Sequence, residues 1–425
     1  MGLFGLLKRS DPHADSGIAL DIGTAFVKAL IFQVKDDHAH VLGVGRTPQK
    51  LADMTGGAVS DIHGVIKNCE TALEQAAKQA GFLPSQTIIG IAGELVKGTK
   101  TTVHHTREQP KTKIDLLELK EMIARVQHQA FEQARAQLAL ETGHDEIDVR
   151  LVHAAVVDVR IDGYRVSNPL GFQGREVEVG VFNVFAPIVH LGALQTIAEE
   201  LDLDLLSIVA EPYAVARAQG AELGAEYSAI FIDIGGGTTD IAAVRNGGIE
   251  GTKMFALGGR AFTKRVAAVL GTGFTEAEQV KLDYSAGNLA DLREEKVRKA
   301  LADDAEVWLG GVELTLAEFT NPRLAESGLD LLPGKILLCG GGSALPEIAQ
   351  LLKTKNWSKN LPFARQPTVH FLQPKDVERV IDETHQLKDP SDVTPMALAN
   401  LAIELVGEEP VMEGILSKVV HGLRQ

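Results

Sequence analysis

The chain has 425 residues, more than one hydrophobic core usually serves, so at least two domains are expected. Lys and Arg number 42 against 57 Asp and Glu, and the net charge of −15 argues against a nucleic-acid partner bound through phosphate contacts. Two isolated cysteines, Cys69 and Cys339, favour a reducing cytoplasm over an oxidising compartment.

The N-terminal part of the chain alternates strand-like and helical segments. Residues 18 to 22 and 27 to 33 predict a hairpin around the turn GTAF, and residues 60 to 81 predict an amphipathic helix. QTIIGIAG, at 86 to 93, predicts a strand. The stretch from 97 to 113 is rich in Lys, Thr and His and lacks apolar periodicity, which predicts a mobile loop.

A mixed unit follows that loop. A helix near 115 to 140 precedes three strand-like runs, VRLVHAAVVDVRID, GYRV and REVEVGVFNVFAP, so residues 85 to 187 predict an inserted α+β subdomain. Helical periodicity resumes at 188 to 201, the strand LLSIVA and the helix AEPYAVARAQG follow, and a second hairpin is expected at 229 to 244. This order repeats that of the first half.

The remainder reads as mainly helical from 252 onward. KILLCGGGSALPEI, at 335 to 348, predicts a buried strand that ends in glycines, with a helix starting at about Leu345. The last strong helix is TPMALANLAIEL, at 394 to 405.

The two hairpins carry the same device. IALDIGTAFVKALIF and IFIDIGGGTTDIAAV each place an Asp at the end of a strand, before a turn rich in Gly and Thr. Glycine lets backbone N–H groups approach an anion closely, and Thr24, Thr238 and Thr239 could add hydroxyl donors. Each copy alone is equally consistent with a tight hairpin that needs glycine at positive φ, but two copies with matched residues favour a ligand site.

The residues around these turns suit a metal-bound phosphate. Asp21 and Asp233 supply hard oxygen ligands of the kind that Mg²⁺ prefers, and Lys28 could reach a phosphate as a point charge. The chain contains no G-x-x-x-x-G-K-[ST] sequence, and neither GGG run has the G-x-G-x-x-G spacing before a helix. The glycines of CGGGSALPEI could permit close packing or leave a flat surface for a base.

Taken in order, five segments resemble those of the actin and heat-shock-chaperone ATPase superfamily. LDIGTAFVK resembles its first phosphate loop, IVAEPYAVA its first connecting helix, IDIGGGTTD its second phosphate loop, LLCGGGSALPEI its adenosine loop and TPMALANLA its second connection. The resemblance implies an α/β actin-like ATPase fold, with two duplicated RNase H-like lobes and an inserted α+β subdomain. It also implies that ATP and Mg²⁺ bind between the lobes.

The resemblance assigns roles to residues at matching positions. Phosphate and metal contacts would come from Asp21, Gly23, Thr24, Ala25 and Lys28 on one side and from Asp233, Gly235, Gly236, Gly237 and Thr238 on the other. Asp21 and Asp233 would hold Mg²⁺, through water. The adenosine loop would use Gly340, Gly341, Gly342 and Ser343.

Three further residues have two interpretations each. Glu211 fits the superfamily carboxylate that orients an attacking water, and it equally fits a carboxylate favoured at a helix start. By the resemblance, Glu278 and Lys281 in FTEAEQVKLDYSAG would contact ribose or base. Their three-residue spacing equally predicts a simple surface ion pair.

The inserted segment selects a branch of the superfamily. QTIIGIAGELVKG and DGYRVSNPLGFQGREVEV resemble the extra subdomain of the bacterial division protein family FtsA, and the resemblance covers residues 17 to 405. It implies an actin homologue that is peripheral on the cytoplasmic face of the cell membrane. Such a protein polymerises, binds the C-terminal peptide of FtsZ, recruits later division proteins and is at most a slow ATPase. The related family PilM, of pilus assembly, is the alternative, and a small-molecule kinase is a third hypothesis.

The resemblance also implies boundaries. The first lobe would take 17–84 and 188–218, the insert 85–187, the second lobe 219–406 with a shortened subdomain at about 252–334, and an amphipathic tail 407–425. Within the shortened part, residues 287 to 334 are expected to lack a long helix before the adenosine loop.

Either terminus could reach a membrane. No window approaches the roughly 20 apolar residues that span a bilayer. Residues 411–423 instead place their apolar side chains on one helical stripe, which could lie in a membrane interface or pack on the protein itself. Residues 3–9, LFGLLKR, combine apolar and basic side chains and compete for the same role.

Overall fold

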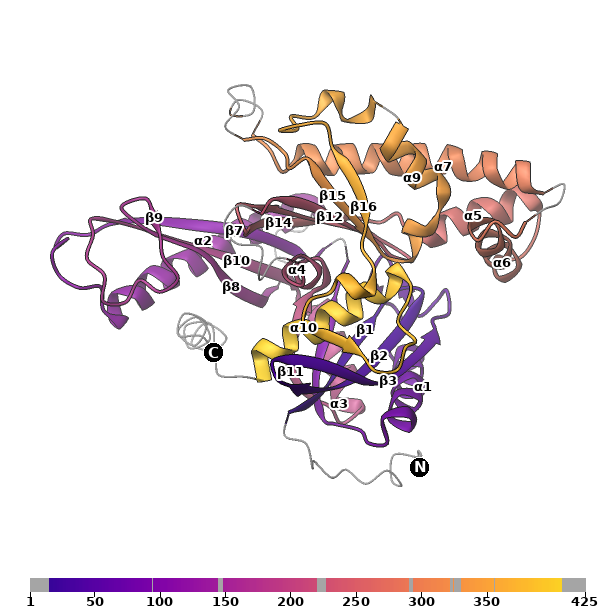
Figure 1. The fold of residues 1–425 in the computed structure, drawn as a ribbon, viewed down its shortest axis with the longest axis horizontal. Helices are drawn as coiled ribbons and strands as arrows, with labels where there is room; N and C mark the ends of the chain where they lie inside the picture. The colour runs from indigo at the N-terminus through magenta and orange to yellow at the C-terminus, as the bar shows by residue number, and fades with distance from the viewer. Residues whose placement is uncertain are drawn as a thin grey trace.

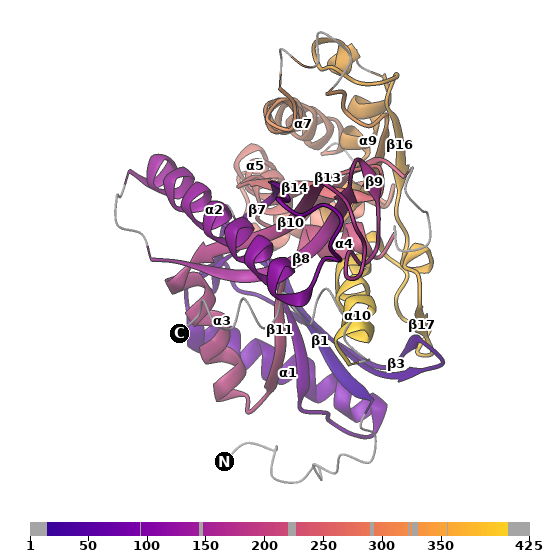
Figure 2. The same cartoon turned by 90° about the vertical axis from the view of Figure 1, so that its left-hand side faces the viewer.

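The computed structural model describes residues 15–93, 95–143, 148–219, 227–289, 293–321, 324, 330–354 and 356–406. Two large sheets divide these residues between two lobes (Figure 1), and the view in Figure 2 shows the same arrangement from the side. Helices cover the sheets in each lobe. The first lobe lies at the bottom of Figure 1 and the second at the top right.

Among the described residues, the sheet of the first lobe has six strands in the order β11-β6-β1-β2-β3-β17. Their bounds are β1 Ser16–Ile22, β2 Phe26–Lys35, β3 His38–Pro48, β6 Gln86–Ile91, β11 Asp204–Ala210 and β17 Val380–Asp382. β1 and β2 form the predicted hairpin, in a register that pairs Asp21 with Lys28. The short hairpin of β4 (Met54–Thr55) and β5 (Ala58–Val59) stands apart from this sheet.

Three helices complete the core of the first lobe. α1 (Ile62–Ala80) packs on β2 and β3, and its ends follow the sequence, since the Asp61 side chain accepts a hydrogen bond from the His63 N–H and Gly81 adopts a left-handed conformation. α3 (Ile188–Glu200) contacts α1, whereas α10 (Val393–Val406) contacts β1, β2 and β6.

Three elements lie in a different lobe or subdomain from the one that the sequence boundaries predict. β6 lies between β1 and β11, so residues 86–91 belong to the first sheet although the insert was expected to begin at 85. α10 and β17 also pack on the first lobe, although both fall within the range assigned to the second. Proximity in sequence misleads here because the chain returns to the first lobe after β16.

The sheet of the second lobe has nine strands within the described residues, in the order β16-β15-β12-β13-β14-β7-β10-β8-β9. Their bounds are β7 Lys97–Thr106, β8 Val149–Ile161, β9 Tyr164–Arg165, β10 Glu176–Pro187, β12 Ala229–Ile234, β13 Thr239–Arg245, β14 Gly248–Phe255, β15 Lys335–Cys339 and β16 Thr368–Phe371. The insert therefore extends the second sheet through the pairing of β14 with β7. α2 (Leu116–Thr142) covers β7 and β10 in this extension (Figure 1).

The expectation of a mobile loop at 97 to 113 is wrong for its first ten residues, which form the interior strand β7. The backbone of β7 pairs with β10 along its length and with β14 at Gly98 and Thr99. Gly98 and Thr101 take buried positions, while Lys100 forms a 3.0 Å ion pair with Glu250. The buried positions of β7 thus carry small or hydroxyl side chains, so the strand shows no apolar periodicity. β-branched Thr nevertheless favours a strand.

The expectation that residues 287 to 334 lack a long helix is also wrong. α7 (Glu294–Ala317) spans 24 residues and buries Val297, Leu301, Trp308 and Val312 against the second lobe. It packs with three other helices, α5 (Gly259–Leu270), α6 (Phe274–Ser285) and α9 (Pro346–Thr354). The apolar stripe of α7 was not recognised in the sequence because acidic and basic residues lie between its apolar residues.

Two predicted features lie outside the described residues, namely the membrane-facing segments 3–9 and 411–423. Among the helices that are described, none combines the length and the apolar character needed to cross a membrane.

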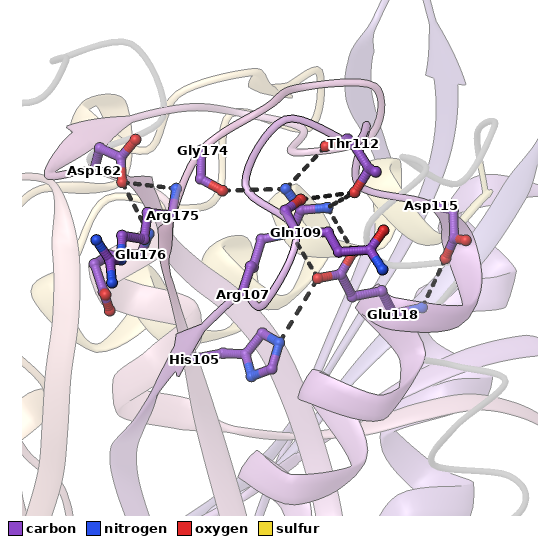
Figure 3. Close-up of polar contacts among 10 residues, drawn as sticks. All are labelled: His105, Arg107, Gln109, Thr112, Asp115, Glu118, Asp162, Gly174, Arg175 and Glu176. Carbon is purple, nitrogen blue, oxygen red and sulfur yellow. Dashed lines mark hydrogen bonds and ion pairs between the residues drawn. The ribbon is translucent and has the colours of Figure 1, made fainter.

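A buried arginine organises the outer end of the insert (Figure 3). Arg107, directly after β7, donates to both carboxylate oxygens of Glu118 at 2.6 and 3.0 Å. Its guanidinium also donates to the carbonyl oxygens of Thr112 and Gly174, at 2.9 and 3.1 Å, and to the Thr112 hydroxyl. All five N–H groups are therefore used, and the segment between β7 and α2 is held against the start of β10.

We expect Arg107→Ala to lower the free energy of unfolding by about 1–3 kcal/mol, because the buried Gly174 carbonyl group, the Thr112 carbonyl group and the Glu118 carboxylate lose their donors. Hydrogen exchange should rise first in residues 107–115. Urea unfolding and exchange measured by mass spectrometry test this, with Arg150→Ala as control, since the ion pair of Arg150 with Asp148 is exposed. Equal unfolding midpoints for the two variants would contradict the assigned role.

Candidate functional site

The two glycine-rich turns meet where the lobes face each other. The first turn follows β1 and contains Thr24 and Ala25, and the second follows β12 and contains Gly236 and Gly237. A Cβ added at Gly236 would lie 2.6 Å from the Ala25 Cβ, and one at Gly237 would lie 2.7 Å from the Thr24 hydroxyl oxygen. Glycine is therefore required for this approach, and the two sequence copies lie together in space.

The turn after β15 joins the same site. β15 runs parallel to β12, so both strands end at the same edge of the sheet. Gly340 has a φ of +80°, and a Cβ at this position would overlap the Asp233 carboxylate. Gly341 to Ala344 then form a 3-10 turn, in which Gly341 is exposed and Gly342 is buried. The buried hydroxyl of Ser343 donates to the Gly340 carbonyl oxygen at 2.7 Å, so it closes this turn.

Four carboxyl groups lie beside the turns, of which Glu211 is half-buried and the other three are buried. They come from different elements: Asp21 from the end of β1, Glu211 from the first residue of α4 (Glu211–Arg217), Asp233 from the end of β12 and Asp240 from the start of β13. The ε-ammonium group of Lys28, in β2, lies among them. Three parts of the chain, the two hairpins and the junction of β11 with α4, thus converge on one acidic centre.

Burial and mutual repulsion favour the protonated form of each carboxyl group. Burial raises the pKa of Asp21 to about 6, with Lys28 opposing the shift and Asp233 adding to it. Burial, together with repulsion from the neighbouring Asp233, raises the pKa of Asp240 to about 8. For Glu211 burial is again the main cause of a pKa well above the ordinary value, followed by repulsion from Asp21.

Asp233 has partners that partly offset its burial. Its pKa is raised by burial, and the hydroxyl of Thr394 and the charge of Lys28 act against that shift. Thr394 lies in α10 and donates to the Asp233 carboxylate. Lys28 in turn donates to the Ser391 carbonyl oxygen, and its Nζ lies 3.8 Å from the Asp392 carboxylate. The segment leading into α10 therefore forms part of this site.

Two residues of the site were missed as site residues in the sequence. Asp240 ends the IDIGGGTTD motif, where its pairing opposite Asp233 across the hairpin could have indicated it. It accepts a 2.9 Å hydrogen bond from the Thr238 hydroxyl, and its Oδ1 is buried with no hydrogen-bond partner among the described residues. Thr394 gave no local signal, because only the return of α10 to the first lobe brings it to Asp233.

Thr239 has a structural role instead. Its hydroxyl donates to the Leu257 carbonyl oxygen at 2.7 Å and accepts from the Trp308 indole N–H at 2.9 Å. Thr239 is fully buried, so the hydroxyl fastens β13 to α7 and does not face the turns.

Glu278 and Lys281 form the ion pair that their spacing allows, at 2.9 Å, but it is not a simple surface pair. Lys281 is only 7% exposed and also donates to the Gly259 carbonyl oxygen at 3.1 Å and to the Thr263 hydroxyl at 2.9 Å. The Gly259 N–H donates in turn to the Gly235 carbonyl oxygen at 2.8 Å. This chain of contacts ties α6 through the start of α5 to the second turn.

In the part of the chain that the structure describes, no group of three or more His, Cys, Asp or Glu side chains is arranged to hold a metal ion. The site offers half-buried glycines of the second turn on one side and a cluster of carboxyl groups on the other. Such an arrangement can receive an anion together with a cation, which would offset the repulsion among the carboxylates.

The raised pKa values predict how stability depends on pH. Between the ordinary value of 3.8 and about 6 for Asp21 or about 8 for Asp240, the folded chain holds protons that the unfolded chain has released. The free energy of unfolding of the protein without ligands should therefore fall as pH rises from 4 to 8, by up to about 1.4 kcal/mol per pH unit for each group. Asp240→Asn should flatten this fall between pH 6 and 8.

Urea unfolding of both proteins at pH 5, 6, 7 and 8 measures this dependence. If the stability of Asp240→Asn falls as steeply between pH 6 and 8 as that of the unchanged chain, Asp240 does not cause the pH dependence.

Comparison with known proteins agrees with this geometry. The sequence model of the family described as "Cell division protein FtsA" matches residues 230–397. The cell division protein FtsA of Bacillus subtilis strain 168 is 25% identical over 349 residues, which cover 79% of this chain and 75% of that protein. FtsA of Pseudomonas aeruginosa is 28% identical over 350 residues, covering 79% of each.

A solved structure titled "PilM-PilN type IV pilus biogenesis complex" superposes with a TM-score of 0.62 at 18% identity. The match covers 91% of this chain and 98% of that one, so the two share a fold. Together with the repeated hairpins, these matches show that the chain is similar to the cell division protein FtsA over most of its length and has the actin-like ATPase fold.

Proposed function

We propose that the chain is an ATP-binding cell division protein that polymerises or acts as an adaptor at the cytoplasmic face of the membrane and links the FtsZ ring to it. The observation that carries the nucleotide part is the contact between two glycine turns beside a cluster of four carboxyl groups. The role in division is supported by the curated relatives, which are named as cell division proteins.

The residues present fit a magnesium-bound triphosphate. Backbone N–H groups of Gly23 to Ala25 and of Gly236 to Thr238 would hold the phosphates, while the Gly235 N–H donates to the Thr238 carbonyl oxygen and closes the second turn. The buried Asp240 Oδ1, which has no hydrogen-bond partner among the described residues, fits a site that gains stability from a cation. The burial and repulsion that raise the pKa of Asp240 fit the same site. When bound, Mg²⁺ would neutralise phosphate charge, with Asp21 and Asp233 holding it through water.

Glu211 is the candidate for positioning a water near the terminal phosphate. It is the first residue of α4, and burial followed by repulsion from Asp21 and Asp240 disfavours its ionised form. A cation beside these carboxylates would lower the pKa of Glu211 and leave an oxygen able to accept a hydrogen bond from water. At most slow hydrolysis is proposed.

The adenosine would lie between the turn after β15 and α6. Gly341 offers an exposed surface without a side chain, and the ion pair of half-buried Glu278 with buried Lys281 sits beside the second turn. The Tyr284 hydroxyl donates to the Glu347 carboxylate and so joins α6 to α9 behind this region.

Gly236→Ala tests the nucleotide site. The added Cβ would lie 2.6 Å from the Ala25 Cβ and 2.9 Å from its nitrogen, so the two turns must separate. We expect the affinity for MgATP, measured by calorimetry, to fall by about tenfold or more. Gly192→Ala is the matched control, because its Cβ meets nothing within 4 Å. Unchanged MgATP affinity in Gly236→Ala would contradict a phosphate site between these turns.

Two partners separate the leading hypotheses. An adaptor of cell division should bind the C-terminal peptide of FtsZ, whereas a PilM-like scaffold of pilus assembly, suggested by the solved structure with PilN, should bind a cytoplasmic peptide of that partner. Fluorescence anisotropy with both labelled peptides decides between them. Phosphorylation of a small molecule would instead support a kinase.

Membrane attachment and polymerisation are tested by sedimentation with anionic liposomes, with and without MgATP. The full chain should pellet with MgATP, and deletion of residues 1–10 or 407–425 should abolish pelleting and so locate the anchor. A full chain that stays in the supernatant under every condition would leave a soluble nucleotide-binding scaffold.

A further inference from the structure

Arg260 bridges the two lobes beside the glycine turns. It is the second residue of α5, and its backbone N–H donates to the Gly236 carbonyl oxygen at 2.8 Å. Its side chain crosses to the segment after β3 in the first lobe. The Nη2 atom donates to the carbonyl oxygens of Gln49 and Lys50, at 3.0 and 3.1 Å, and Nη1 donates to that of Met54 at 3.3 Å.

These contacts close a ring that contains both turns. The Gln49 N–H donates to the Ala25 carbonyl oxygen at 2.9 Å, so the segment that Arg260 holds is itself fastened to the first turn. Ala25 lies directly against Gly236 of the second turn. The path from Gly236 through Arg260 and Gln49 to Ala25 is thus continuous, and we call it the Arg260 clasp.

The segment that receives the guanidinium is held in place by buried polar contacts. Asp53 is 2% exposed and accepts hydrogen bonds from the Lys50 N–H and from the Asn68 amide, both at 2.8 Å. Its charge favours the protonated guanidinium, against the effect of burial, which lowers the pKa of Arg260. The three carbonyl oxygens are thus held in fixed positions and match the several N–H donors of a planar guanidinium. A lysine ammonium group does not have this geometry.

We propose that Arg260 is a positioning residue. The Arg260 clasp sets the distance between the two glycine turns and thereby determines how well a polyphosphate fits between them. The inference rests on the proposed nucleotide site. Arg260 contacts carbonyl groups of the protein, so it acts through the turns. Loss of the clasp should therefore weaken binding of the phosphates while the contacts with adenosine remain.

The test uses the full chain with Arg260→Ala and Arg260→Lys. Arg265→Ala is the matched control, because Arg265 lies in the same helix and its guanidinium pairs with Asp304 inside the second lobe, at 2.6 Å. Calorimetry with MgATP and with adenosine gives the contribution of the phosphates as the ratio of the two affinities. We expect this ratio to fall by about tenfold or more in Arg260→Ala, to be only partly restored in Arg260→Lys and to stay unchanged in Arg265→Ala.

A general structural role predicts a different result, since adenosine and MgATP affinities would then fall together. That outcome, or an unchanged ratio in Arg260→Ala, overturns the inference.

A second measurement needs no nucleotide. Spin labels at Lys78→Cys in α1 and Lys299→Cys in α7, both at exposed positions, report the distance between the lobes by pulsed electron resonance. Arg260→Ala should broaden and lengthen the distance distribution, and an unaltered distribution would refute the Arg260 clasp. If the unchanged chain binds no nucleotide, the proposed function fails, and the spin-label result still decides whether the Arg260 clasp exists.

Discussion

Gly236 lies against Ala25 and Gly237 against Thr24, and this contact between two hairpin turns constrains everything around it. It requires β1 and β12, which belong to different sheets, to end at one place. The aspartates at the ends of these strands are then forced close together in a buried setting. A larger side chain in the second turn would force the two turns apart. The repulsion between the aspartates would then decrease, but the groups that the site needs would be separated.

The acidic centre is the electrostatic consequence of that contact. The buried Lys28 ammonium group offsets part of the charge of Asp21, Asp233 and Glu211, and the pKa values of all four carboxyl groups are raised. Hydrogen bonds from Thr238 and Thr394 offset part of the repulsion. The folded chain thus holds in place a charge arrangement that is unfavourable by itself, as expected where geometry serves a ligand more than it serves stability.

Local patterns in the sequence predicted what is local in the structure. The hairpins follow from apolar runs around glycine turns, and the ends of α1 follow from Asp61 and Gly81. β7 was missed because Gly98 and Thr101, which carry no apolar signal, occupy its buried positions. Of the site, the paired turns and Asp21, Asp233 and Glu211 came from motif and resemblance. Thr394 and Arg260 could not be found that way, because their partners lie more than a hundred residues away in the chain.

The return of α10 to the first lobe has a consequence for how the protein is made. Thr394 binds Asp233, and the residues just before α10 hold Lys28, so the acidic centre needs parts of the chain that leave the ribosome among the last. The first lobe also lacks β17 and the helix that covers β1 until then. A nascent chain therefore exposes an unfinished sheet edge for most of its synthesis, and the site for its ligand forms only near the end.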